Sequence, residues 1–153
     1  MARVVWKPGA VPPKWHGRVQ WWYDGDTLLV RDGALRHVVR LFGCDAPEVG
    51  QQGFALAREF LRGRTDKGNC EVTPICLDRY GRVVARLRSP GNLDVSLELI
   101  AAGMAWHDVR YARLETAYAA AQEAARAAKL GIWSRIPWGF APWVWRRRAG
   151  VYG

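Results

Sequence analysis

The chain has 153 residues, a formal net charge of +9, and half of its residues are apolar. This length suits one domain with one core, and the apolar content excludes a globally disordered chain. No apolar run is long enough to span a bilayer, whereas the excess of Lys and Arg favours a polyanionic partner such as nucleic acid.

The first 16 residues, 1–16, are expected to form an N-terminal extension. They contain Lys7, Lys14 and several prolines, but no apolar segment of the kind that a signal peptide requires. We therefore expect a cytoplasmic protein by default, or a secreted one if a signal had been removed.

The following part of the chain, to about residue 87, is mostly strand-like. Short runs of aliphatic and aromatic residues predict strands over 19–23, 28–31, 35–42, 71–77 and 83–87. Asp32-Gly33 predicts a tight hairpin between the second and third strands. Pro74 lies inside the fourth strand and indicates a bulge or an edge position, because proline cannot donate to a ladder.

Three helices are predicted, one among the strands and two after them. The first covers 51–64, where apolar residues recur at helical spacing. The second follows Asp94, a favourable N-cap, and runs through Ala102. The third covers 113–130, with an apolar stripe of Leu114, Tyr118, Ala121 and Ala125.

This order of elements predicts an α+β fold with a mainly β core, a five-stranded OB-fold barrel with three helices. The domain is expected to cover 17–135, followed by a C-terminal tail, 136–153, rich in Trp, Pro and Arg. The tail allows two interpretations. It could pack on the body as a clasp with solvated arginines, or offer a strip that stacks bases and binds the phosphates of single strands.

Two acidic segments could perform chemistry, although each also has a structural explanation. Asp24-Gly25-Asp26-Thr27 is by itself typical of a turn between strands. In Asp45-Ala46-Pro47-Glu48, the first residue could cap a helix, with Glu48 completing a capping box. Alternatively, Asp26 and Asp45 could share a metal ion, which would leave Glu48 free to reach a water molecule.

Two arginines could complete such a site. Arg40 lies in an apolar strand, where its charge is costly to bury unless it is paired or bound. Arg82 follows a Tyr-Gly turn, a position that by itself is typical of a solvated residue. Two fixed guanidinium groups would suit a phosphate, and acidic oxygen ligands without nearby His or Cys favour calcium, magnesium or manganese.

Together these motifs resemble the staphylococcal nuclease family over most of the chain, from about residue 17 to 134. The resemblance is carried by Asp24–Thr27, Arg40–Glu48, Asp78–Arg82, Gly103–Ala105 and Gly131–Ser134. It implies a five-stranded OB barrel with three helices. It also implies a calcium ion (Ca²⁺) on Asp26, Asp45 and the carbonyl of Ala46, with Mg²⁺ or Mn²⁺ left as alternatives by the oxygen ligands. It implies phosphate ligands at Arg40 and Arg82, and a base for water at Glu48.

The resemblance extends to the substrate and its products. It implies a monomeric, calcium-dependent, sugar-nonspecific nuclease that hydrolyses DNA and RNA, prefers single strands, leaves 3′-phosphate ends and has no membrane partner. Arg79, Tyr80 and Tyr111 would bind the substrate. A second tyrosine that flanks the nucleotide in the family falls here on Val109. The alternative function is a non-catalytic nucleic-acid-binding OB-fold module.

Overall fold

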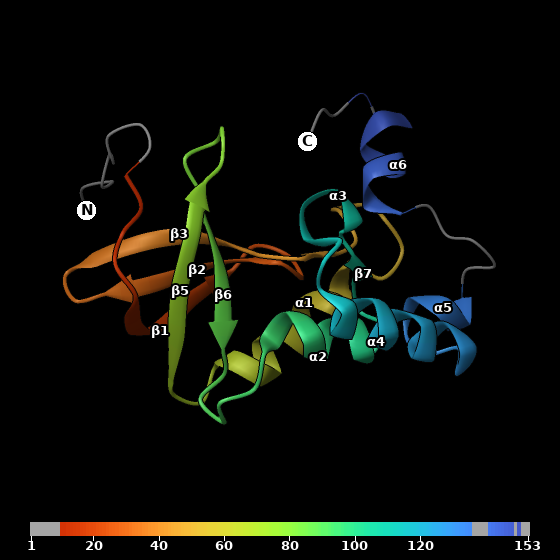
Figure 1. The fold of residues 1–153 in the computed structure, drawn as a ribbon, viewed down its shortest axis with the longest axis horizontal. Helices are drawn as coiled ribbons and strands as arrows, with labels where there is room; N and C mark the ends of the chain where they lie inside the picture. Colours follow the sequence, from red (N-terminus) through yellow and green to blue (C-terminus); the bar gives the residue numbers. More distant parts are fainter. Residues whose placement is uncertain (1–9, 136–140, 149, 151–153) are drawn as a thin grey trace.

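The structure is a computed structural model that describes residues 10–135, 141–148 and 150 (Figure 1). Five strands form a closed barrel in the order β1-β2-β3-β6-β5. They are β1 (Trp15–Trp22), β2 (Thr27–Asp32), β3 (Leu35–Leu41), β5 (Asn69–Leu77) and β6 (Val83–Arg88). β1 pairs antiparallel with β5, and β3 runs parallel to β6. The predicted α+β fold with a five-stranded OB-type barrel is confirmed.

Local sequence accounts for one hairpin and one bulge of the barrel. Asp32 pairs with Leu35 at the end of the β2–β3 hairpin, and Gly33 between them has a φ of 58°, which glycine adopts without strain. The β5–β6 register shifts between Pro74 and Cys76, where the missing N–H of proline interrupts the ladder. Both features were predicted.

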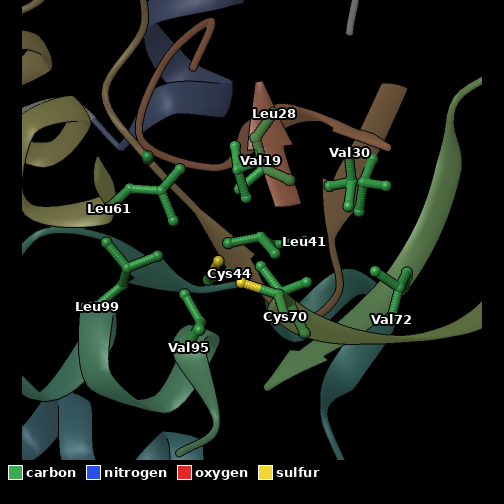
Figure 2. Close-up of a cluster of buried hydrophobic side chains, with 14 of the residues drawn as sticks. Val19, Leu28, Val30, Leu41, Cys44, Leu61, Cys70, Val72, Val95 and Leu99 are labelled. Carbon is green, nitrogen blue, oxygen red and sulfur yellow. The ribbon is translucent and has the colours of Figure 1, made fainter. Parts of the chain in front are cut away.

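The core fills the barrel and continues between the strands and the neighbouring helices, which contribute Leu61, Val95 and Leu99 (Figure 2). Along β3 and β6 every second residue is buried, as expected for strands that present one face to a core. The fully buried side chains include Leu28, Val30, Val39, Leu41, Leu61, Val72, Leu87, Val95, Leu99 and Ile100. This packing holds the barrel and the helices at 54–65 and 95–101 as one body on which the polar site is built.

The three predicted helices are present: α1 (Phe54–Thr65), α2 (Val95–Ala101) and α4 (Thr116–Ala127). Asp94 is the N-cap of α2, and its side chain accepts a hydrogen bond from the backbone N–H of Leu97 at 3.2 Å. The prediction for α4 was wrong at its start. The helix begins at Thr116, and Leu114 lies before it with 85% of its surface exposed, outside the buried stripe.

Five shorter elements were not predicted. They are β4 (Cys44–Asp45), β7 (Trp106–His107), α3 (Val109–Ala112), α5 (Ile132–Arg135) and α6 (Pro142–Arg148). Four of them have only two to four residues and show no hydrophobic period, so sequence patterns do not reveal them. β4 and β7 form a two-stranded antiparallel sheet, which fixes the backbone of Asp45 opposite Trp106. α6 lies in the tail, beside α3 in Figure 1.

Trp138, one of the tail tryptophans considered for base stacking, lies outside the described residues. Across the ranges that the structure describes, no helix combines the length and the apolar character needed to cross a membrane.

Candidate active site

Asp26 is buried at the mouth of the barrel, in the loop between β1 and β2. Its Oδ2 accepts a hydrogen bond from the backbone N–H of Ala46 at 2.6 Å, and its Oδ1 accepts one from the Thr27 hydroxyl at 3.0 Å. Burial alone would raise the pKa of Asp26, but the charge of Arg40 and these hydrogen bonds hold it below its ordinary value. The side chain is therefore a buried carboxylate anion.

Gly25 explains how this loop reaches its place. A Cβ atom at this position would lie 2.6 Å from Cβ of Ala57 in α1 and 2.7 Å from Cβ of Ala46. Only glycine allows the loop to pass this close to both elements. The Asp-Gly-Asp motif is thus more than a turn signal, because its glycine seats Asp26 against the segment that follows β4.

Asp24 is a further acidic residue of the site that was not among the predicted site residues. Its Oδ1 accepts a hydrogen bond from the backbone N–H of Asp26 at 2.9 Å. Burial and the neighbouring charge of Asp26 raise the pKa of Asp24 to about 8, so this carboxyl holds a proton at neutral pH in the metal-free protein. The repeated acid in Asp-Gly-Asp was the available sequence signal.

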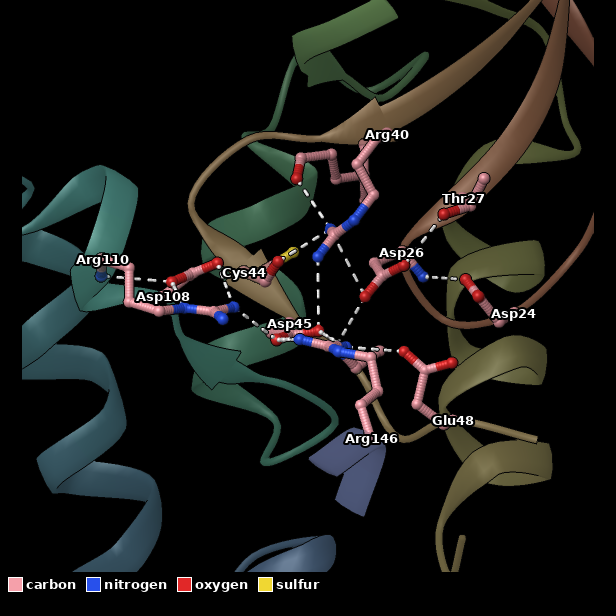
Figure 3. A network of polar contacts seen from close by, with 12 residues as sticks. Asp24, Asp26, Thr27, Arg40, Cys44, Asp45, Glu48, Asp108, Arg110 and Arg146 are labelled. Carbon is pink, nitrogen blue, oxygen red and sulfur yellow. Dashed lines mark hydrogen bonds and ion pairs between the residues drawn. The ribbon is translucent and has the colours of Figure 1, made fainter. Parts of the chain in front are cut away.

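Asp45 is the most buried acid of the site, with no exposed surface, and arginines surround it (Figure 3). Its Oδ1 lies 3.3 Å from Arg40 and 3.1 Å from Arg146, and its Oδ2 lies 3.1 Å from Arg110 and 2.8 Å from Arg146. Burial raises the pKa of Asp45, while the guanidinium groups of Arg146 and Arg40 act in the opposite direction. These contacts compensate a charge that would otherwise be prohibitively costly to bury.

Arg40 joins the two buried acids through one guanidinium group. Its Nη1 lies 3.3 Å from Oδ2 of Asp26, and its Nη2 lies 3.3 Å from Oδ1 of Asp45. Nη1 also donates hydrogen bonds to the carbonyls of Leu41 and Cys44, at 3.0 and 2.8 Å. The expectation that an arginine in this apolar strand must be paired is met by these four contacts.

Glu48 lies at the edge of the cluster, with 32% of its side chain exposed. Its Oε1 accepts a hydrogen bond from Arg146 at 2.7 Å, and its backbone N–H donates to the Gln51 side chain at 2.9 Å. The capping-box alternative is wrong. α1 begins after Gly53, without a side-chain cap, and Asp45 belongs to β4. The carboxylate of Glu48 is therefore not used to cap this helix.

Two arginines of the cluster were not predicted as site residues. Arg110 follows Val109 in α3, pairs with Asp108 at 3.0 Å and reaches Asp45. Arg146 comes from α6, about a hundred residues along the chain from the acids it contacts. The sequence offered no signal for Arg146 beyond the basic run at 146–148, because the contact is made by tertiary packing.

The remaining predicted site residues lie outside this cluster of contacts. Arg82 pairs with Asp78, its Nε donating to Oδ2 at 2.6 Å, and its guanidinium lies 5.2 Å from the ring centre of Tyr80. Arg79 also stacks on Tyr80, at 4.9 Å. Tyr111 is 75% exposed, with Arg110 over its ring at 5.6 Å. The structure thus brings Asp26, Arg40, Asp45, Ala46 and Glu48 together and leaves the other four predicted residues outside this cluster.

The donor chemistry of the cluster fits a hard divalent cation. Asp26 and Asp45 offer carboxylate oxygens close enough for one guanidinium to contact both, and Ala46 joins them through its backbone. Within the described ranges, no three side chains of Asp, Glu, His or Cys converge closely enough to hold a metal by themselves. Backbone, water and substrate oxygens would have to complete the coordination sphere.

Comparison with known proteins adds independent information. Residues 38–135 match the family of staphylococcal nuclease homologues. An uncharacterized endonuclease of Escherichia coli is 32% identical over 136 residues, covering 87% of this chain and 86% of the relative. A micrococcal nuclease of Shigella flexneri is 37% identical over 149 residues, covering 88% and 84%. Protein ParB of Escherichia coli is 31% identical over 156 residues, covering 90% and 84%.

Proposed function

Since the chain belongs to the staphylococcal nuclease family, we propose that it hydrolyses phosphodiester bonds of DNA and RNA in a calcium-dependent reaction. The family and the relatives named as endonucleases support a nuclease. The single observation that carries the proposal is the juxtaposition of Asp26, Arg40, Asp45 and Glu48 at the mouth of the barrel. Charges that serve only to stabilise the fold would not require a partly exposed carboxylate, Glu48, beside the buried Asp26 and Asp45.

The acids have different roles because their surroundings differ. Asp26 and Asp45, with the carbonyl of Ala46, would hold the cation. When bound, that cation supplies positive charge to a phosphate oxygen and lowers the pKa of an adjacent water. The side chain of Glu48 is 32% exposed, so it can reach solvent and accept the proton of the attacking water. Calcium is favoured over metals that prefer nitrogen or sulfur ligands because every donor is oxygen, and magnesium or manganese is the alternative.

The arginines stabilise the charge that develops during attack. A phosphodiester is already anionic, and the added negative charge in the transition state calls for fixed positive groups. Arg40 lies directly beside the two acids, and we expect its guanidinium to contact a phosphate bound next to the cation. Arg82 now pairs with Asp78 and would exchange this partner for a phosphate oxygen. In-line attack that expels the 5′ oxygen leaves 3′-phosphate ends.

Exposed residues at the edges of the site are suited to a flexible strand. Tyr111 and Tyr80 present 75% and 55% of their surfaces to solvent, and Arg79 lies over the Tyr80 ring. Aromatic rings stack on bases without regard to the sugar, and arginines bind the backbone. These features support a sugar-nonspecific enzyme that prefers single strands, in which bases are free to stack.

The proposal is tested by incubating the full chain with denatured DNA, duplex DNA and single-stranded RNA, first with calcium and then with excess chelator. We expect cleavage of both single strands, slower cleavage of the duplex, 3′-phosphate ends and loss of activity with chelator. Magnesium and manganese are compared in place of calcium. Binding without cleavage under all these conditions would contradict the proposal and favour a non-catalytic OB-fold module.

A further inference from the structure

Arg146 makes three hydrogen bonds to the carboxylates of the acidic cluster. Its Nη1 and Nη2 donate in parallel to Oδ1 and Oδ2 of Asp45, at 3.1 and 2.8 Å. Nη1 also donates to Oε1 of Glu48 at 2.7 Å. Only 11% of the Arg146 side chain is exposed, against none of Asp45. One guanidinium thus bridges a proposed metal ligand and the proposed base (Figure 3).

Neighbouring residues of α6 hold Arg146 in this place. Pro142 is buried at the first position of the helix. The ring of Trp143 lies under the guanidinium of Arg110, 5.2 Å away, and the Trp145 ring would be 3.6 Å from a Cβ atom added at Gly50. Each side of the cluster therefore has a contact with α6, from α3 on one side to the segment before α1 on the other.

A divalent cation and the Arg146 guanidinium would use the same oxygens. Both oxygens of Asp45 already accept from Arg146, and a cation on Asp45 would stand within a few ångströms of a positive guanidinium. Two like charges at that distance repel strongly in a buried environment. The bidentate pair with Asp45 and coordination of a cation by Asp45 therefore exclude one another.

We propose that α6 is an autoinhibitory cap whose Arg146 competes with the cation for Asp45 and shields Glu48. This inference rests on the proposed function, since it concerns the same metal site. In the metal-free protein Arg146 compensates the buried charge of Asp45. Cation binding displaces it and at the same time releases Glu48 to reach water, so the tail sets the cation concentration at which the site becomes competent.

Isothermal titration of the full chain with calcium alone tests the proposal without any reliance on cleavage. We compare wild type, Arg146→Ala, and Arg147→Ala as a control that removes the same charge from an exposed position of the same helix. Removing the competitor should tighten calcium binding by about tenfold, the effect of losing an ion pair of about 1.4 kcal/mol. Arg147→Ala should stay within about twofold of wild type.

A lysine variant and melting curves distinguish competition for calcium from a folding defect. Arg146→Lys keeps the charge but loses the two parallel hydrogen bonds, so its calcium affinity should fall between those of wild type and Arg146→Ala. Calcium should raise the melting temperature of Arg146→Ala more than that of wild type, because a tighter ligand stabilises more. The order of these shifts must follow the order of affinities.

Several results would overturn the proposal. Equal or weaker calcium binding by Arg146→Ala would show that Arg146 does not compete, while leaving the metal site itself intact. A rate of DNA cleavage at saturating calcium more than tenfold below wild type would make Arg146 a substrate ligand instead. If no variant binds calcium, magnesium or manganese, the metal-dependent function and the inference fail together.

Discussion

At the scale of single residues, Arg40 links the two buried acids of the site, because its guanidinium contacts both Asp26 and Asp45. Lysine keeps the charge but cannot reach two carboxylates and two carbonyls at once. We expect Arg40→Lys to lower single-turnover cleavage by about 10² to 10³ and to cost about 1–3 kcal/mol of stability. Arg62→Lys, which changes a surface pair with Glu59, is the control. Cleavage within a few-fold of wild type would assign Arg40 a structural role only.

Asp24 should make the stability of the metal-free protein depend on pH. Its pKa is raised from 3.8 to about 8, so the folded chain holds a proton that the unfolded chain releases. This contribution is complete below about pH 4 and is lost as pH rises through 8. In chelator, the stability of Asp24→Asn relative to wild type should increase by about 1–3 kcal/mol between pH 5 and 8.5, less than the full shift because Asp24 is only half-buried. A stability difference between Asp24→Asn and wild type that stays constant across this pH range would contradict the raised pKa of Asp24.

The sequence indicated several residues of the site for a definable reason. An arginine in an apolar strand and acids at strand ends are costly unless they are used together, and the structure brings Asp26, Arg40, Asp45 and Glu48 together. Arg110 and Arg146 could not be recognised in this way. Their side chains reach Asp45 from separate short helices, and neither position breaks a local sequence rule.

At the scale of elements, the approach of the β1–β2 loop to α1 depends on Gly25. We expect Gly25→Ala to destabilise the fold by about 1–3 kcal/mol and to lower cleavage, because the added methyl group must push the loop that carries Asp26. Gly63→Ala is the matched control. Gly63 is exposed within α1 and its Cβ would meet nothing within 4 Å, so alanine should stabilise by about 0.5–1 kcal/mol. Chemical denaturation measures the free energy of unfolding of both variants. Equal effects of the two substitutions would contradict the role of Gly25 in the approach of the loop to α1.

Element prediction succeeded where a period or a turn signal was present. The barrel strands, the Asp32-Gly33 hairpin and the bulge after Pro74 follow from alternation and from backbone chemistry. It failed for β4 and β7, which have two residues each and are formed by a pairing between distant segments. The prediction that Leu114 belongs to the apolar stripe of α4 was also wrong. This residue has helical spacing from the stripe but lies before the start of the helix and is exposed.

At the scale of the whole molecule, the net charge of +9 predicts binding of nucleic acid that weakens with salt. Glu48→Gln allows this to be measured without turnover. It should bind single strands nearly as wild type does, yet cleave them about a hundredfold or more slowly. For contacts with about four to six phosphates, the plot of log affinity against log salt should have a slope of about −3 to −4. A flat plot, or equal losses of affinity and rate, would point to a structural Glu48 and a non-electrostatic interface.

The most direct measurement is single-turnover cleavage of single-stranded DNA at saturating calcium by wild type and by Asp26→Asn. Asparagine preserves the size of this buried side chain and removes only the charge that a cation needs. We predict a fall of at least about a hundredfold, with Glu59→Gln, a change at a 70% exposed side chain, equal to wild type. Wild-type rates for Asp26→Asn would contradict a metal-dependent nuclease at this site.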